Sequence, residues 1–220
     1  LLDTADLTVA LRNAIATDEL TLHYQPIVDS RTAEVDGTAE IHAFEALVRW
    51  RLPGRDGLMP PDEFIGFAER RSLIIDIDCW VLDKAIGQAA KWKSDPRLSG
   101  IPIAINISSR HLANDNFVDN DAAPLAKYGV DPAKIIVEVT ESAILHDLGA
   151  AAVKFQRLRD IGVRISIDDF GTGYTSLAHL RSLPIDELKI DRSFTANAGR
   201  SEQEASLVKQ IIDIAHLLGA

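Results

Sequence analysis

Short apolar segments alternate with amphipathic segments along most of the chain, and this alternation limits the folds that it can adopt. A chain that switches repeatedly between strand and helix builds βα units around a largely parallel sheet. Six candidate strands are visible, at residues 20–29, 41–50, 101–108, 134–141, 163–169 and 187–191. A closed (β/α)8 barrel needs eight strands, so the alternation alone leaves open both a barrel and an open doubly wound sheet.

The composition is that of a globular protein and argues against two kinds of partner. Of the 220 residues, 46% are hydrophobic and 25% are charged, and no stretch approaches the roughly 20 apolar residues of a membrane span. The net charge of −10 comes without a dense Lys/Arg tract, which argues against binding to polymeric nucleic acid. The single cysteine, Cys79, cannot form an internal disulfide, as expected in a reducing compartment. We therefore expect a cytoplasmic domain that makes no membrane contact of its own.

Polar residues recur on one face of five consecutive candidate strands. Alternate residues of a strand share a face, and the polar residues placed opposite aliphatic ones in this way are Glu45, Arg49, Asn106, Glu138, Asp168, Lys189 and Asp191. An antiparallel sheet with one solvated face would give the same alternation, but the intervening helices argue against it. If the aliphatic faces pack against helices, the polar faces converge at the mouth of a barrel, where barrel enzymes place their chemistry. This convergence favours the barrel.

Four of these side chains form a candidate metal site: Glu45, Asn106, Glu138 and Asp168. Carboxylates gathered at one point repel one another unless a cation lies between them, and carboxylate and amide oxygens suit Mg²⁺ or Mn²⁺ rather than zinc. Asp169 would point away in a regular strand, but a turn at the strand end would bring both aspartates to two metal ions. Taken singly, each carboxylate is more typical of a surface residue or an ion pair.

Two basic residues on the same faces indicate the chemistry. Lys189 is placed to orient a nucleophilic water or to stabilise negative charge on a phosphoryl group, and Arg49 shares the face of Glu45, which favours a phosphate contact. Metal ions, a lysine and an arginine together predict two-metal hydrolysis of a phosphodiester.

A set of motifs follows one order along the chain: YQPIVD, FEALVRW, PDEFIGFAE, IDCWVL, INISSRHL, VEVTES, IDDFGTGYTSLAHL and LPIDELKIDRSF. Together they span Tyr24 to Phe194 and resemble the EAL domain family of cyclic di-GMP phosphodiesterases. The resemblance implies an α/β fold, a modified TIM (β/α)8 barrel whose first strand runs antiparallel to the others. It implies an EAL barrel domain at residues 20–220, with residues 1–19 as a lead-in helix and junction to an upstream domain.

The resemblance also implies roles for the site residues. The implied metal ligands are Glu45, Asn106, Glu138, Asp168 and, for a second ion, Asp169. Lys189 resembles the lysine that positions the catalytic water, and Asp191 supports it. Gln25 and Arg49 resemble the substrate-contacting pair, and Glu141 resembles the glutamate that holds the loop beginning at Asp168. The implied reaction is hydrolysis of cyclic di-GMP to linear pGpG with two Mg²⁺ or Mn²⁺ ions.

Two departures from the family pattern stand out. Ser72 occupies a position where the family usually has glycine, with a slight expected effect. Family members also continue past the equivalent of Ala220 into a strand that carries a glutamate, and later a glutamine. This sequence contains neither, so we expect the C-terminal strands of the barrel to be missing from the chain.

Two function classes remain open. The first is an active phosphodiesterase, and the second is a catalytically inactive module that binds cyclic di-GMP and passes the signal on. Inactive members typically lose a residue of the EAL or DDFG motif or the lysine, whereas Glu45, Asp168, Asp169 and Lys189 are all present, which favours the enzyme. By analogy with the family, we also expect a homodimer through the barrel and an upstream GGDEF or sensor domain.

Overall fold

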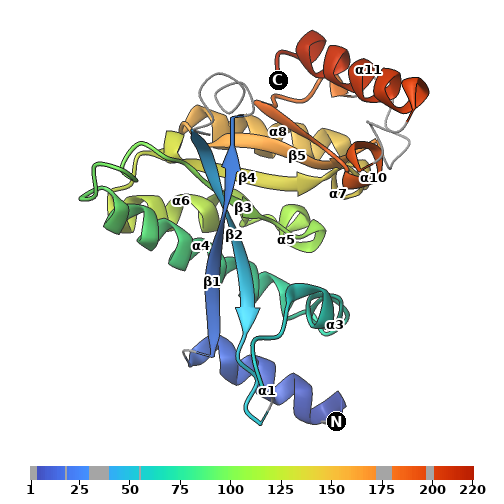
Figure 1. The fold of residues 1–220 in the computed structure, drawn as a ribbon. Helices are drawn as coiled ribbons and strands as arrows, with labels where there is room; N and C mark the ends of the chain where they lie inside the picture. The colour runs from blue at the N-terminus through green and yellow to red at the C-terminus, as the bar shows by residue number, and fades with distance from the viewer. Residues whose placement is uncertain (1–3, 18, 30–39, 55, 172–179, 197–200) are drawn as a thin grey trace. The chain divides into compact units, whose positions relative to one another are not determined.

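The computed structural model describes residues 4–17, 19–29, 40–54, 56–171, 180–196 and 201–220. These residues divide into two compact units, one formed by residues 1–106 and 123–135 and the other by residues 107–122 and 136–220. Figure 1 labels their helices and strands. One of the three chain boundaries between these units falls inside α6 (Phe117–Tyr128), a helix that contains Pro124.

The first unit contains three strands and the helices that precede or follow them. Its elements are α1 (Thr4–Ala16), β1 (Leu20–Val28), β2 (Ile41–Trp50), η1 (Pro61–Glu63), α3 (Ile65–Arg70), α4 (Ile74–Trp92), β3 (Ile103–Asn106) and η2 (Pro132–Lys134). The pair β1–β2 is antiparallel and matches Leu20 with Trp50, whereas β2–β3 is parallel and matches Phe44 with Ile103.

Helix α4 covers the strands of this unit because its apolar residues recur every three or four positions. Its buried residues include Ile74, Ile77, Val81, Leu82 and Ala85, the spacing that puts side chains on one face of a helix. The helix contacts all three strands. At its end, the ring of Trp92 lies 5.0 Å from the rings of both Tyr24 and Phe44, which ties β1 and β2 to the helix.

The second unit contains three further strands, and helices follow β4 and β6. Its elements are α5 (Ser109–Ala113), β4 (Ile135–Thr140), α7 (Glu141–Leu145), α8 (Leu148–Asp160), β5 (Arg164–Phe170), β6 (Glu187–Ile190), α10 (Arg192–Thr195) and α11 (Glu202–Leu218). Both β4–β5 and β5–β6 are parallel, and their registers match Glu138 with Ser166 and Ser166 with Glu187.

Local sequence signals set the helix ends of this unit. Thr140, Asp147 and Ser201 each accept a backbone N–H bond at the start of α7, α8 and α11, the usual role of such side chains at a helix N-cap. Helix α11 ends at Gly219, whose φ of 82° is the left-handed conformation favoured there.

The described strands confirm the α/β fold with an antiparallel first strand. The six strands follow the six apolar segments of the sequence, with every described pair after β1–β2 parallel. No seventh or eighth strand lies within the described ranges. Within those ranges, no helix has both the length and the hydropathy needed to cross a membrane.

Candidate active site

In the first unit, pairing of the strands gathers three of the predicted site residues. Gln25 of β1 lies directly opposite Glu45 of β2, and opposite residues of an antiparallel pair project to the same face. Asn106, the last residue of β3, donates from Nδ2 to Glu45 Oε1 at 2.7 Å. The side chain of Asn106 is exposed and that of Glu45 is half-buried, so this oxygen-rich group is accessible from solvent.

Arg49 lies on the same face of β2 but nearer to the end of the strand. Four residues of a strand span about 13 Å, so its backbone is well separated from that of Glu45. Its Nη1 donates to the Val48 carbonyl oxygen at 2.9 Å. The structure therefore keeps Arg49 beside the group of Glu45, Asn106 and Gln25 rather than within it.

In the second unit, three adjacent strands bring together Glu138, Asp168 and Lys189. Lys189 Nζ donates to Glu138 Oε2 at 2.9 Å and lies 3.6 Å from Asp168 Oδ1. The Glu138 side chain is 1% exposed. A carboxylate removed from water to this degree requires a nearby positive charge or hydrogen-bond donors, and the lysine supplies both.

The two aspartates of β5 do not continue the regular strand. The register with β6 slips by one residue between Ile167 and Phe170, which makes Asp168–Asp169 part of a β-bulge. Asp169 has a φ of +54°, a left-handed conformation uncommon outside glycine, and its N–H donates to Asp168 Oδ1 at 3.0 Å. The bulge breaks the alternation that would otherwise send the two side chains to opposite faces.

Asp191, which directly follows β6, interacts with the side chain of Asp169 and also caps the start of a helix. Its Oδ1 accepts the Ser193 N–H at 2.8 Å as the N-cap of α10. Hydrogen bonds from the Ser193 side chain and backbone lower the pKa of Asp191. Partial burial raises the pKa of Asp169, and the negative charges of Asp168 and Asp191 raise it further. Asp168 and Asp191 are thus close enough to Asp169 to oppose its ionisation, as neighbouring carboxylates do in the absence of a cation.

Glu141 holds the chain where β5 ends. It is the first residue of α7, and its side chain is 3% exposed. Its Oε2 accepts the Gly171 N–H at 3.0 Å. Glu141 therefore fixes the backbone two residues after Asp169, at the edge of residues 172–179, which lie outside the described ranges.

The described residues include no group of three or more His, Cys, Asp or Glu side chains already arranged around one metal position. The donor chemistry nevertheless fits a hard divalent cation, because the candidate ligands offer only carboxylate and amide oxygens. In the second unit their negative charge is partly balanced by Lys189.

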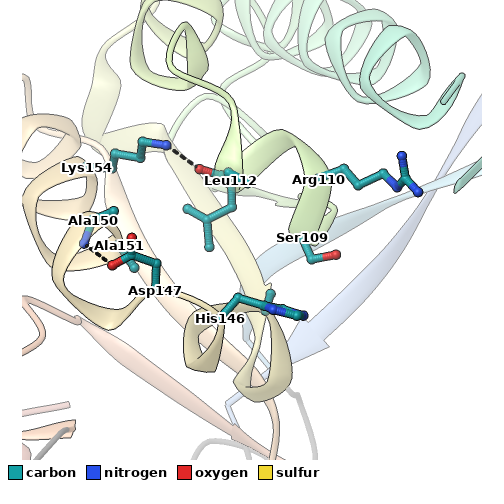
Figure 2. Close-up of a pocket in the computed structure, with 10 residues that line it drawn as sticks. Ser109, Arg110, Leu112, His146, Asp147, Ala150, Ala151 and Lys154 are labelled. Carbon is teal, nitrogen blue, oxygen red and sulfur yellow. Dashed lines mark hydrogen bonds between the residues drawn. The ribbon is translucent and has the colours of Figure 1, made fainter.

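A cavity of about 330 Å³ lies elsewhere in the second unit, between α5, α7 and α8. Its lining includes Ser109, Arg110, Leu112, His146, Asp147 and Lys154 (Figure 2). Lys154 Nζ donates to the carbonyl oxygens of Leu112 and Asn114 at the end of α5. Its ammonium group is therefore already hydrogen-bonded to the C-terminal end of that helix. None of the predicted site residues lines this cavity.

One residue that packs beside the site was not predicted from the sequence. Phe194 of α10 packs against Gly171: a Cβ placed on that glycine would lie 2.7 Å from Phe194 Cε2. The two residues are far apart in the sequence, and no periodicity links them. The only sequence signal was the glycine itself directly after the aspartates, which is typical of a close approach of backbone to another group.

Comparison with known proteins identifies the family. The EAL domain model matches residues 8–220. The chain is 41% identical over 211 residues to the cyclic di-GMP phosphodiesterase NbdA of Pseudomonas aeruginosa, covering 94% of this chain and 26% of that protein. It is 39% identical over 208 residues to the bifunctional diguanylate cyclase/cyclic di-GMP phosphodiesterase MucR of the same species, covering 94% of this chain and 29% of that protein.

A solved structure shows the same fold. The PaMucR phosphodiesterase in complex with c-di-GMP matches with a TM-score of 0.87 and 37% identity, covering 96% of this chain and 83% of that one. The chain spans about a third or less of the length of the curated relatives that it matches. The family model and these relatives agree over nearly the whole chain, which therefore belongs to the EAL domain family.

Proposed function

We propose that this chain is the catalytic domain of a metal-dependent phosphodiesterase that hydrolyses cyclic di-GMP to linear pGpG in bacterial signalling. The observation that carries the proposal is the cluster in the second unit, where Lys189 bridges the buried Glu138 and Asp168 beside the β5 bulge. The names of NbdA and MucR and the cyclic di-GMP in the PaMucR structure support the choice of substrate.

The residues proposed to hold two Mg²⁺ or Mn²⁺ ions are Glu45, Asn106, Glu138, Asp168 and Asp169. When bound, the ions would lower the pKa of a coordinated water and neutralise charge on the phosphoryl group. Carboxylate and amide oxygen ligands of this kind would also favour such hard cations over softer metals.

The protein groups complete the proposed mechanism. Lys189 is anchored by Glu138 and Asp168, so its ammonium has a fixed position from which to donate to the attacking water. Asp191 supports it from the end of β6, while Glu141 fixes the backbone after Asp169. Gln25 and Arg49 are proposed to contact the substrate, with the guanidinium directed at a phosphate.

Hydrolysis of cyclic di-GMP by the full-length protein, followed by chromatography of pGpG, tests this proposal. We expect product formation with Mg²⁺ or Mn²⁺, none with EDTA, and a loss of about 100-fold or more in Glu45→Gln, which keeps the shape of the side chain but removes its charge. Tight binding of cyclic di-GMP without cleavage under either metal would replace the enzyme with a receptor. Absence of both binding and cleavage in a folded protein would remove both functions.

The remaining proposals concern the whole protein. Because the chain covers only part of its relatives, and MucR is described as both a cyclase and a phosphodiesterase, we propose that a GGDEF or sensor domain lies upstream. We also propose a cytoplasmic site of action and a homodimer through the barrel. Sedimentation velocity over a range of protein concentrations tests the dimer.

A further inference from the structure

Phe194 and Gly171 make an unusually close contact in the second unit. A Cβ on Gly171 would lie 2.7 Å from Phe194 Cε2 and 3.1 Å from Cζ, closer than carbon atoms approach in folded proteins. Gly171 also has a φ of +101°, which side chains rarely adopt. The half-buried ring of Phe194 therefore rests directly on the backbone of Gly171, and the glycine makes this approach possible.

The same short stretch of backbone is held from two other directions. The Gly171 N–H donates to the buried Glu141 Oε2 at 3.0 Å, and the Asp191 N–H donates to the Phe170 carbonyl oxygen at 3.3 Å. Three elements thus restrain the chain at the end of β5: α7 through Glu141, the end of β6 through Asp191, and α10 through Phe194.

This restraint lies directly after a strained residue. The φ of Asp169 is +54°, and such a conformation in a residue other than glycine costs roughly 1–3 kcal/mol and persists only where the surroundings enforce it. Glu141 and Asp191 hold this stretch through hydrogen bonds, whereas Phe194 blocks movement of the chain by direct contact between its ring and the Gly171 backbone. Loss of the ring would let the peptide after Asp169 move toward α10.

We propose that Phe194 is a positioning residue for the metal site, because its ring on Gly171 maintains the bulge that directs the carboxylates of Asp168 and Asp169. Phe194 touches neither substrate nor metal in this inference. It acts through the backbone, so it controls how tightly the aspartates bind a divalent cation. The inference rests on the proposed metal-dependent function and adds to it a residue outside the ligand set.

The test compares Phe194→Ala with the unchanged full-length protein. We expect the apparent Kd for Mn²⁺, measured by calorimetry without substrate, to rise about tenfold, as for other residues that orient metal ligands. The Mn²⁺ concentration for half-maximal hydrolysis should rise equally, whereas kcat at saturating Mn²⁺ should largely recover. Phe194→Leu, which keeps apolar bulk, should fall between the two and provides the test if the alanine variant does not fold.

Phe67→Ala is the matched control, because Phe67 is a half-buried phenylalanine of α3 in the first unit. It removes the same number of atoms and should leave the Kd for Mn²⁺ within about twofold of the unchanged protein. An increase in the Kd for Mn²⁺ as large as that of Phe194→Ala would mean that any loss of apolar packing weakens metal binding, and it would overturn the inference.

A double-mutant cycle separates the ring–glycine contact from other effects of the substitution. Gly171→Ala should weaken Mn²⁺ binding because its Cβ meets the ring. Gly171→Ala should weaken Mn²⁺ binding less in the Phe194→Ala background, because the ring that its Cβ would contact is absent. The effects of the two substitutions on the free energy of Mn²⁺ binding should therefore be strongly non-additive. If the fold-increase in the Kd for Mn²⁺ in the double variant equals the product of the two single fold-increases, Phe194 does not act through Gly171.

The outcomes also separate this inference from the proposed function. If the unchanged protein binds Mn²⁺ and cleaves cyclic di-GMP while the Phe194 variants behave identically, the positioning role is wrong and the enzyme stands. If the folded, unchanged protein neither binds Mn²⁺ nor cleaves cyclic di-GMP, the proposed function and the positioning role both fall.

Discussion

At the scale of single residues, the ion pair of Lys189 can be separated experimentally from its proposed catalytic role. Its ammonium pairs with a glutamate that is 1% exposed, so the pair matters to folding as well as to the proposed chemistry. The sequence predicted that Glu138, Asp168 and Lys189 would share a face, because strand alternation is regular and readable. It did not predict that the lysine would bind the glutamate directly, because alternation gives the face of a side chain and not its partner.

Replacing Lys189 by methionine should destabilise the protein in EDTA by about 3 kcal/mol, because Glu138 keeps its buried position but loses the opposite charge. Mn²⁺ should restore part of that stability without restoring hydrolysis. Chemical denaturation with and without Mn²⁺ measures the effect. Lys127→Met is the control, since its partner Asp83 lies in an exposed ion pair and the expected loss is below about 1 kcal/mol. Equal losses in the two variants would contradict a special role for the buried pair.

At the scale of elements, the β-bulge of β5 decides where two adjacent carboxylates point. The six strands and most helices could be predicted, because apolar periodicity and capping residues are local signals. The bulge could be anticipated only as a turn at the strand end. Its cause is tertiary: the register with β6, the hydrogen bond from Gly171 to Glu141 and the ring of Phe194 all come from segments remote in sequence.

Substitutions at Asp169 should separate its backbone conformation from its charge. Asparagine tolerates a φ of +54°, so Asp169→Asn should change the free energy of unfolding by less than about 0.5 kcal/mol while lowering metal-dependent hydrolysis about 100-fold. Valine is branched at Cβ and strained in this conformation, so Asp169→Val should also destabilise the fold by roughly 1–3 kcal/mol. Thermal unfolding and pGpG assays check both variants. Similar stability of the two would argue against a strained bulge in solution.

At the scale of the whole molecule, the excess of acidic groups favours cation binding. The chain carries 33 Asp and Glu residues against 23 Lys and Arg, and part of that excess is concentrated around the candidate site. The sequence predicted this acidic cluster through motif order and strand alternation. It did not reveal the division into two compact units, because that depends on contacts between distant segments rather than on any linker-like composition.

Divalent cations should therefore stabilise the folded protein. A cation at 100 times its Kd adds about 2.7 kcal/mol to the free energy of unfolding, which should appear as a rise in Tm on titration with Mn²⁺. Glu138→Gln should abolish most of that rise in Tm. Glu187→Gln should keep it, because it removes a β6 carboxylate that is paired with Arg164 of β5. An equal rise in Tm with Mn²⁺ in both variants would indicate that the metal binds non-specifically to the protein surface.

The contact of Lys189 with Glu138 and Asp168 has a consequence for how the protein matures. Carboxylates that are buried together without a counterion oppose the folding of the chain that carries them. Lys189 is a counterion attached to the chain itself, so the site can assemble without any metal. Under the proposed function, a metal ion would therefore bind to carboxylates that are already held in place, and Lys189 would stay close enough to act as a hydrogen-bond donor.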